Sequence, residues 1–570
     1  MRKKALSVVC FMLVIILLAS CAPAGRGGGA ATPAPGGTVT QPGQATPAPG
    51  QQQPAAPERP DLGPHLSEAP WWPDHQEFTM WAAMTRLAGV LPSWEENLVI
   101  QTMAEATNTQ IRFLHPPVGS ETEHFNMMIA SGDLPDMIMD GWLGRPGGPA
   151  HFIQNNIIIR LNELWDDYAP NALYWFRNVR PEISREIMID DGTIYTMPSV
   201  YYHRDLAVFN GPVIRGDMAA KIGVVWEDFP KTIDQWEEML VAVRDHPELG
   251  GQGVIPFSFN MIQNFNTPLF LGAWGIFQEW YQVDGEVRFG MVQPEYKEFL
   301  ALMRRWFEMG LIDPEFPANT GAMQDEKVLG DRVFSFIGSM GGHITRYTAL
   351  ARPNNPDFTL LPVHYPTFTP GEIPQVTQET AWFIGGVAIT SAARDPARLV
   401  RLLDYNFSEQ GHQLHNWGIE GVSFEFDEDG NRRFLPVIMD SPRGWARDQA
   451  MAAYALWQSQ MSNFKKRYEL EQRDSLPEQL IGRTFWMQSP NHFLMPPVTP
   501  TMDEANEFAG LMVDINAYSR EMATNIILGN IDLDDGFQTM VDTLFGMGME
   551  RAIELRQAAL ERFLARPPSI

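Results

Sequence analysis

The stretch that decides the fold reads TEHFNMMIASGDLPDMIMD and spans residues 122–140. Its first half predicts a helix over 122–131, because apolar side chains recur at helical spacing and Gly132 follows directly. Its second half, 136–140, is a short apolar run of the kind that forms a buried strand. A helix that leads within a few residues into a buried strand is typical of a strand–helix–strand unit.

The same alternation extends in both directions from this stretch. Upstream, the pattern predicts a strand at 77–84, a helix at 94–107 and a strand at 110–115. Downstream, it predicts strands at 333–337 and 383–390, and helices at 234–244, 295–309, 395–408, 502–528 and 535–563, the last with a bend at 546–548. Alternating strands and helices predict an α/β fold with mostly parallel sheets and crossover helices.

The N-terminus has the pattern of an export signal. Three basic residues lie within 2–4, and an unbroken apolar run follows over 8–18, which is shorter than a membrane-spanning helix needs. The tetrad Leu-Ala-Ser-Cys at 18–21 resembles the lipobox of bacterial lipoprotein signal peptides. That resemblance implies cleavage before Cys21 and lipid on this cysteine. The other interpretations are a plain signal peptide with an incidental cysteine, or an uncleaved anchor.

Residues 21–70 differ in composition from the rest of the chain. They are rich in Pro, Gly, Ala, Thr and Gln and contain few large apolar side chains. Such a segment cannot bury enough surface to offset its chain entropy, so we expect a disordered tether between a membrane and a folded body that starts at residue 71.

Composition excludes several classes of function. The formal net charge of −27 argues against nucleic acid as a partner, because phosphate binding needs a concentrated basic face. Cys10 leaves with the signal and Cys21 is expected to carry lipid, so no cysteine remains for disulfides, catalysis or metal binding. No nucleophile elbow, phosphate loop or zinc motif is present, and the 30 methionines are best explained as core residues. We therefore expect no enzyme activity and no cofactor, and we assign no metal-ligating residues; whether a structural metal is bound stays open.

Five short segments resemble extracellular solute-binding proteins, the receptors that feed ABC importers, over about 71–566. They are FNMMIASGDLPD (125–136), DGTIYTMP (191–198), IRGD (214–217) with PKTIDQW (230–236), NWGIEGVSF (416–424) and DEDG (427–430). The last two resemble a long-chain lipoprotein subgroup linked to oligosaccharide uptake. One departure is Gly216, which stands where the family has lysine and leaves the role of that segment open.

The resemblance implies two α/β lobes joined by a hinge of two or three crossings, with the ligand held in a cleft between the lobes. We expect a signal peptide over 1–20 and a solute-binding body over 71–570. We assign 71–205 and 325–380 to the first lobe, and 206–324 and 381–570 to the second. The implied partners are an oligosaccharide and the permease subunits of an ABC transporter. We expect a monomer held by its lipid on the outer face of the cell membrane, or in the periplasm if the cell has an outer membrane.

Sugars present apolar ring faces and hydroxyl groups, so aromatic and polar residues in loops after strands are candidate ligands. After the strand at 136–140, Asp140, Trp142 and Arg145 lie on or beside a glycine-rich loop. A tryptophan in such a loop is hard to bury by local packing, so we expect Trp142 to contact the ligand.

The remaining candidates lie near expected lobe crossings or follow other strands. They are Tyr201, Tyr202 and His203 at the end of the first lobe, Trp382 before the strand at 383–390, Asn264, Trp274, His343, Trp417 and Glu420. Simple packing explains Trp274 equally well, and a structural role is the better explanation for Glu420.

Three functions remain open at this stage. The first is a transport receptor for an oligosaccharide. The second is a protein of the same fold that binds a peptide or a modified sugar, or that serves a sensor kinase. The third, which the missing catalytic motifs disfavour, is an extracellular hydrolase.

Overall fold

The computed structural model describes residues 71–84, 89–202, 206, 208–225, 229–260, 270–375, 383–445, 447–456, 461–465, 476–488 and 493–570. They belong to one compact unit, Arg59–Ile570. The signal peptide, Cys21 and the tether lie outside these residues, as do His203, Asn264 and Trp382.

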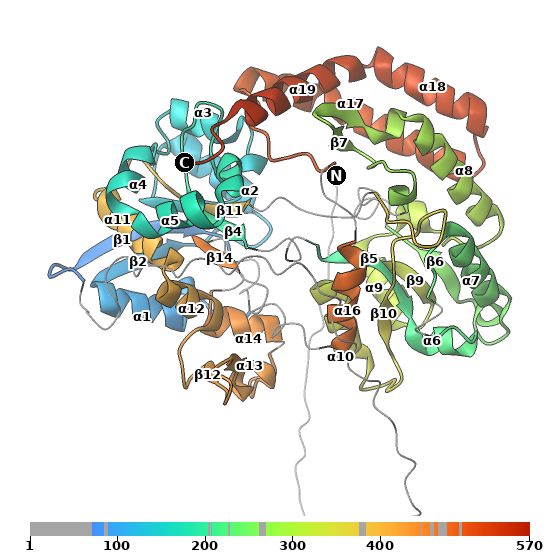
Figure 1. Ribbon diagram of the computed structural model, residues 1–570, viewed down its shortest axis with the longest axis horizontal. Coiled ribbons are helices and arrows are strands. Elements are labelled where there is room, and N and C mark those ends of the chain that lie inside the picture. Colours follow the sequence, from blue (N-terminus) through green and yellow to red (C-terminus); the bar gives the residue numbers. More distant parts are fainter. Residues whose placement is uncertain are drawn as a thin grey trace, which may run out of the picture. The chain divides into compact units, whose positions relative to one another are not determined.

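The first of two main sheets has six strands in the order β14-β4-β11-β3-β1-β2 (Figure 1). These are β1 (Gln76–Ala82), β2 (Thr109–Leu114), β3 (Met137–Asp140), β4 (Met197–Tyr201), β11 (Phe383–Ile389) and β14 (Asn463–Lys465). All run in the same direction except β11, which is antiparallel to both of its neighbours. The expected mostly parallel sheet is therefore present.

The second sheet has four strands in the order β10-β5-β9-β6. They are β5 (Asn210–Arg215), β6 (Ile255–Ser258), β9 (Val333–Ser339) and β10 (Leu360–Pro362). β6 pairs with β9 in parallel, while β5 is antiparallel to β9 and β10, so this sheet is mixed. Two hairpins stand apart from these sheets, β7 (Trp280–Val283) with β8 (Glu286–Phe289) and β12 (Phe424–Phe426) with β13 (Arg432–Phe434).

The expected division of the chain between the lobes is wrong in its second half. β9 and β10 belong to the second sheet rather than to the first lobe, whereas β11 and β14 belong to the first sheet rather than to the second lobe. The chain passes from the first sheet to the second after β4, returns before β11 and crosses again after β14. Hydrogen bonds between strands remote in sequence decide this membership, and no local pattern encodes them.

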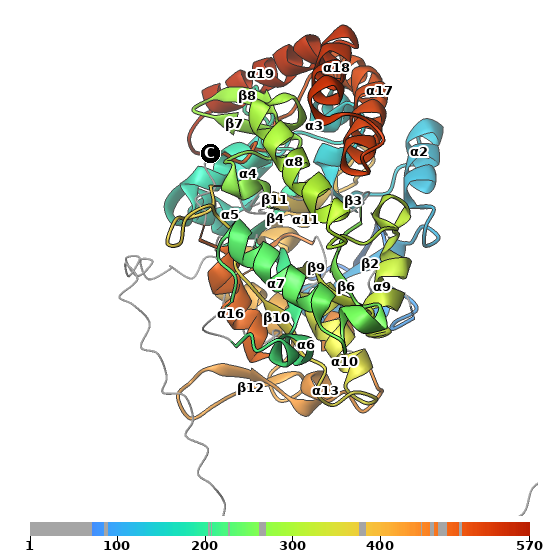
Figure 2. The same ribbon diagram turned by 90° about the vertical axis from the view of Figure 1, so that its right-hand side faces the viewer.

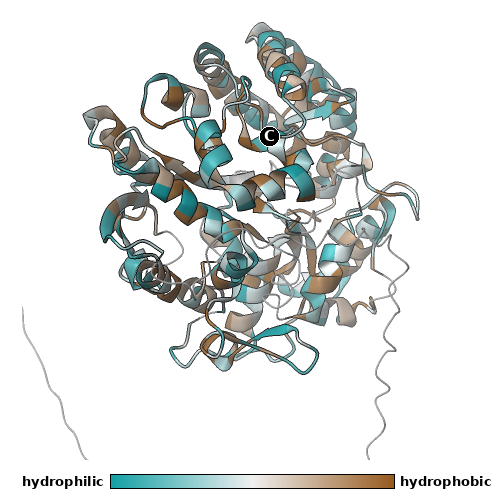
Figure 3. Ribbon diagram, turned by 60° about the vertical axis from the view of Figure 1, so that its left-hand side comes forward, coloured by the Kyte–Doolittle hydropathy of each residue, from teal (hydrophilic) through white to brown (hydrophobic). Residues whose placement is uncertain are grey.

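Helices flank both sheets (Figures 1 and 2). In the segments of the first sheet they are α1 (Leu98–Thr107), α2 (Glu121–Ser131), α3 (Gly148–Gln154), α4 (Asn162–Tyr168), α5 (Pro170–Tyr174), α11 (Pro396–Asp404), α12 (Glu409–Trp417), α13 (Pro436–Met439) and α14 (Arg447–Tyr454). In the segments of the second they are α6 (Gly216–Lys221), α7 (Ile233–Asp245), α8 (Pro294–Glu308), α9 (Gly321–Leu329), α10 (Arg346–Ala351) and α16 (Pro477–Trp486). Polar and apolar residues alternate along these helices in Figure 3, as amphipathic helices require.

The chain ends in three helices, α17 (Met502–Ile527), α18 (Leu533–Gly546) and α19 (Met549–Ala565). Thr501 starts α17 with a capping box, because its side chain accepts from the Glu504 amide and Glu504 accepts from the Thr501 amide. Gly548, with φ of 102°, separates α18 from α19 and confirms the predicted bend. Apolar residues of α17, α18 and α19 join the core of the second lobe.

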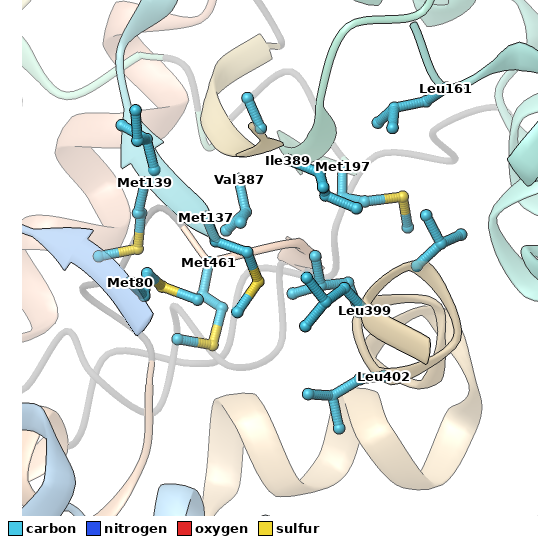
Figure 4. Close-up of a cluster of buried hydrophobic side chains, with 14 of the residues drawn as sticks. Met80, Met137, Met139, Leu161, Met197, Val387, Ile389, Leu399, Leu402 and Met461 are labelled. Atoms are coloured by element: carbon cyan, nitrogen blue, oxygen red, sulfur yellow. The ribbon is translucent and has the colours of Figure 1, made fainter. Parts of the chain in front are cut away.

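Methionines fill the core of the first lobe, as expected from the composition. Met80, Met137 and Met197 are fully buried on three strands of the first sheet, and Met461 approaches them from the segment before β14 (Figure 4). Flexible thioethers fill irregular gaps between the sheet and the leucines of α11.

Gly216, where the family pattern has lysine, lies against the side chain of Leu361. A Cβ atom at this position would lie 2.6 Å from Cδ1 of Leu361, so a lysine would force a shift. The neighbouring Arg215 is fully buried and forms ion pairs of 2.7 Å with Asp217 and with Asp331. In this chain, Gly216 and Arg215 therefore make packing and ion-pair contacts within the second lobe.

Candidate functional site

The carboxyl edge of the first sheet gathers several predicted ligand residues. β1, β2, β3, β4 and β14 all end at this edge, so Asp140 at the end of β3 and Tyr201 at the end of β4 share it. β11 is antiparallel and begins there, directly after Trp382, a residue outside the described ranges. Ligands of open α/β sheets bind outside such carboxyl ends.

The chain crossings also leave from this edge. β4 ends there before the first crossing, β11 starts there after the second, and β14 ends there before the third. On the second sheet, β5 begins beside the end of β9, with Asn210 opposite Ser339, and β10 ends at the same edge. The first two crossings therefore join the carboxyl edge of one sheet to the carboxyl edge of the other.

Asp140 and Arg145 bind each other. Arg145 donates from Nε to Oδ2 of Asp140 at 2.6 Å and from Nη2 to Oδ1 at 3.0 Å. The Arg145 guanidinium also lies 4.0 Å from the ring centroid of Phe125. Arg145 Nη1 is left for another acceptor, because no hydrogen bond of this atom is found among the described residues. A paired arginine of this kind is held in one orientation and can present that remaining donor to a ligand.

The expectation that Trp142 escapes burial is wrong. The side chain is 0% exposed and packs edge-on against Phe152 and Phe125, at centroid distances of 5.4 and 6.3 Å. Those rings come from α3 and α2, so residues outside the glycine-rich loop supply the packing. Trp417 is also 0% exposed and stacks on Phe434 at 4.6 Å. In this conformation both tryptophans serve the core.

Tyr201 and Tyr202 lie at the start of a crossing, as the sequence predicted, and Tyr201 ends β4, a strand that was not predicted. Both are partly buried, and the ring of Tyr202 meets that of Trp175 edge-on at 6.1 Å. The Arg180 guanidinium lies 5.6 Å from the Tyr202 centroid. These two aromatic rings remain candidates for ligand contact.

His343 follows β9 at the carboxyl edge of the second sheet. Its Nδ1 accepts a hydrogen bond of 2.9 Å from the Ser339 amide. Burial, followed by the nearby Arg346, lowers the pKa of His343 to about 4, so the ring is neutral at pH 7. A neutral ring can exchange hydrogen bonds with sugar hydroxyls.

His364, which sequence reasoning missed, occupies the matching position after β10 at the same edge. Its ring lies 3.8 Å from that of Phe485, and burial lowers its pKa. Only the sheet topology brings this residue beside the predicted site, and no motif in the sequence marks it.

The other two predicted ligand residues lie in different settings. Trp274 is partly exposed, and its Nε1 donates to Glu298 at 2.9 Å. Glu420 is exposed and forms an isolated bridge with Phe424 in the turn before β12. Neither belongs to the strand ends described above.

A cavity of about 360 Å³ lies between the loop after β3 and the C-terminal helices. It is lined by Leu143, Gly144, Arg145, Pro146, Gly147, Gly148, Pro149, Val498, Thr499, Pro500, Glu504, Ala505, Asn506, Phe508, Ala509, Leu555, Arg556 and Ala559. α3 and α17 are in contact here, as Figures 1 and 2 show. Of the predicted residues Arg145 lines the cavity, whereas Arg556 was not predicted because it reads as ordinary helix polarity.

The part of the chain that the structure describes contains neither a metal-binding cluster nor a membrane-spanning helix. No group of three or more His, Cys, Asp or Glu side chains in those ranges is arranged to hold a metal ion. No described helix combines the length and apolar character that crossing a membrane requires.

Comparison with known proteins gives distant relatives. No family model matches the sequence. The fructooligosaccharide ABC transporter substrate-binding protein FusA of Streptococcus pneumoniae is 24% identical over 477 residues, 77% of this chain and 82% of FusA. Its structure in complex with kestose covers 86% of this chain and 99% of its own, with a TM-score of 0.65 and 20% identity. The lipoprotein LipO of Bacillus subtilis is 21% identical over 348 residues, 58% of this chain and 64% of LipO.

A solute-binding protein from Bifidobacterium longum infantis, described as binding HMO and as associated with an ABC transporter, has a TM-score of 0.70 at 16% identity. The match covers 86% of this chain and 100% of that protein. The chain is thus a distant homologue of the substrate-binding proteins of carbohydrate ABC transporters and has their α/β fold. FusA and the Bifidobacterium protein are by name binding proteins of transporters rather than enzymes, as expected from the sequence.

Proposed function

We propose that this distant homologue of carbohydrate-binding receptors captures an oligosaccharide between the carboxyl edges of its two sheets and delivers it to an ABC transporter permease. The observation that supports this most directly is the topology of the crossings. Because two of them join the two carboxyl edges, a sugar bound there would contact hinge segments and couple binding to closure.

The surroundings of these edges suit a saccharide. Tyr201 and Tyr202 offer rings to apolar sugar faces, and His343 and the Asp140–Arg145 pair offer polar groups to hydroxyls. FusA, a fructooligosaccharide transporter's substrate-binding protein with a structure in complex with kestose, points the same way. We also propose that lipid on Cys21 holds the receptor on the outer face of the membrane, which fits the name of the lipoprotein relative.

A ligand screen by thermal unfolding tests the proposal. A saccharide present at a hundredfold its dissociation constant should stabilise the body by about 2.7 kcal/mol. If no saccharide of any class raises the melting temperature, the oligosaccharide claim fails, and a peptide or sensor ligand replaces it.

A variant pair then tests the place of binding. Tyr202→Ala should weaken binding by about 1–3 kcal/mol if a sugar ring packs there, the range found for aromatic stacking on flat ligands. Tyr168→Ala is the matched control, because Tyr168 is an exposed tyrosine on α4. If Tyr202→Ala and Tyr168→Ala bind the sugar with equal affinity, the sugar does not bind beside the end of β4.

A further inference from the structure

The cavity between the β3–α3 loop and the C-terminal helices holds an arginine without a counter-charge. Arg556 of α19 forms no ion pair or hydrogen bond with any described residue, and its Nε is buried without a partner. The other two charged lining residues are paired, Arg145 with Asp140 and Glu504 with Arg562. Of the three charged residues that line the cavity, Arg556 is therefore the one that no described residue pairs. It is a positive charge in a chain whose net charge is −27.

Aromatic rings fix the orientation of this guanidinium. Its carbon lies 4.4 Å from the centroid of Phe508 and 5.7 Å from that of Trp280. Aromatic rings attract a guanidinium over their faces, and the hydrogen-bond donors of the group lie in its own plane. The two terminal nitrogens of Arg556, which no described residue binds, are the donors that an anionic partner would use.

The burial of Arg556 is only weakly compensated by the protein. Burial lowers the pKa of Arg556, and the nearby Glu279 offsets this in part. Glu279 is itself engaged by Arg520 at 3.3 Å. A buried or partly buried charge without a hydrogen-bonded partner is costly, and a ligand anion would relieve that cost.

The opposite wall of the cavity adds matching donors. Arg145, on the loop of the first lobe, has Nη1 left over from its pair with Asp140. Asn506 lines the cavity from α17, is exposed, and offers an amide suited to hydroxyls. The volume of about 360 Å³ lies at the lower end of small-ligand pockets.

We propose that this cavity is a carboxylate subsite, in which Arg556 and Arg145 hold the acidic group of a uronic acid unit and so select an acidic oligosaccharide. The inference rests on the proposed function and names the class of sugar. A carboxylate matches the planar edge of a guanidinium and can accept two parallel hydrogen bonds from it. Because the two arginines come from different lobes, such a group would also bridge them.

Calorimetric titration of the full mature protein tests this subsite. The probes are uronic acid oligomers of matched length, built from glucuronate, galacturonate or mannuronate, each paired with its carboxyl-reduced neutral counterpart. We expect at least one acidic oligomer to bind tenfold or more tightly than its reduced form, with an affinity that falls as salt rises. Equal affinity within every pair, with sugars still binding, would overturn the subsite and leave the proposed function intact. Absence of binding by all sugars would instead remove the proposed function.

Variants assign the effect to Arg556. Arg556→Gln should weaken binding of the acidic form tenfold or more and binding of the reduced form much less, so that the preference for the acidic form is lost, and Arg556→Lys should retain a part of the preference. Arg551→Gln is the control, because Arg551 lies on the same helix but forms exposed pairs with Glu507 and Glu554. If Arg556→Gln does not fold, two other measurements test the subsite. They are the preference of the Arg556→Lys variant for the acidic form and the salt dependence of acidic-sugar binding by the wild type. An equal fold-loss of affinity for the acidic sugar and for its carboxyl-reduced counterpart, in either folded variant of Arg556, would contradict the proposal.

Discussion

Arg566, four residues before Ile570, binds Asp190 in the turn before β4. Its Nε and Nη2 donate to Oδ1 of Asp190 at 3.0 and 2.6 Å, and its side chain is fully buried. Arg562 donates from Nε to the other oxygen of the same carboxylate at 2.7 Å. The end of α19, whose upstream residues pack in the core of the second lobe, is thereby tied to the first lobe. This tie supplements the three covalent crossings.

Asp190→Asn should lower the free energy of unfolding by about 3–5 kcal/mol, because it leaves a fully buried guanidinium without its counter-charge. Chemical denaturation measures the change. Glu507→Gln is the control: its partner Arg551 is half exposed, so about 0–1 kcal/mol is expected. A loss for Asp190→Asn no greater than that of the control would mean that the tie contributes nothing to stability.

Trp142→Ala should destabilise the protein by about 3–5 kcal/mol, because it empties a large space in a packed core. Trp142→Phe should cost less, since it keeps a ring and removes a buried Nε1–H that has no partner. Thermal and denaturant unfolding measure both. Trp274→Ala, at a partly exposed tryptophan, provides the comparison and should cost less than Trp142→Ala. If Trp142→Ala is as stable as the wild-type protein, Trp142 is not a core residue and becomes a candidate ligand residue again.

Lys327→Met should destabilise the second lobe by about 3–5 kcal/mol at pH 7. Lys327 Nζ lies 2.7 Å from Oδ2 of Asp313, and both side chains are almost fully buried. Burial raises the pKa of Asp313, but hydrogen bonds from Lys327, Asn319 and Ser258 together lower it below its usual value. Asp313 therefore stabilises the fold above its unfolded pKa, and this contribution disappears as the pH falls through the lower folded pKa.

The double variant Lys327→Met, Asp313→Asn separates the charge from the packing. It should recover a part of the lost stability, because it removes the unpaired carboxylate. If the double variant is less stable than Lys327→Met alone, the buried charge is not the cause of the loss.

Stability should fall in the pH interval from about 6.5 to about 4 through His343. The pKa of this histidine is lowered in the folded protein, so the unfolded chain binds the proton first as the pH falls. The contribution is complete above pH 6.5 and decreases by up to about 3 kcal/mol by pH 4. Unfolding of the wild type and of His343→Gln between pH 7.5 and pH 4 measures it. Parallel pH profiles of the two proteins would exclude His343 as the source.

Cys21→Ala should release the protein from membranes or block its processing, while the melting temperature of the body stays the same. The tetrad at 18–21 is the basis of this prediction. Membrane fractionation, mass spectrometry of the N-terminus and thermal unfolding measure the three effects. A variant that is still cut before residue 21 and still membrane-bound would contradict the lipobox interpretation.

Much of the local structure could be read from the sequence because its causes are local. Gly132 ends α2 with φ of 71°, and Thr232 starts α7 with a capping box, both where helix ends were expected. Resemblance to solute-binding proteins added the two-lobed α/β class, which the solved structures confirm. The bend at Gly548 was likewise visible as glycines within a helical pattern.

The candidate site was only partly predictable. Asp140 ends β3, Tyr201 ends β4 and His343 follows β9, so all three lie at the carboxyl edges of the sheets. His364 and Arg556 were missed, because their positions depend on which strands pair and which helices meet. Those contacts join residues that are remote in sequence, so the pattern of residues adjacent to His364 and Arg556 does not predict them.

What the sequence by itself determined is a part of the helices, strands and turns, those whose periodicity, caps or glycines act within a few residues. Only the tertiary structure decided that β9 joins the second sheet and β11 the first, and that rings from α2 and α3 bury Trp142. The physical reason is that sheet pairing and core packing gain free energy from surfaces brought together across long stretches of chain.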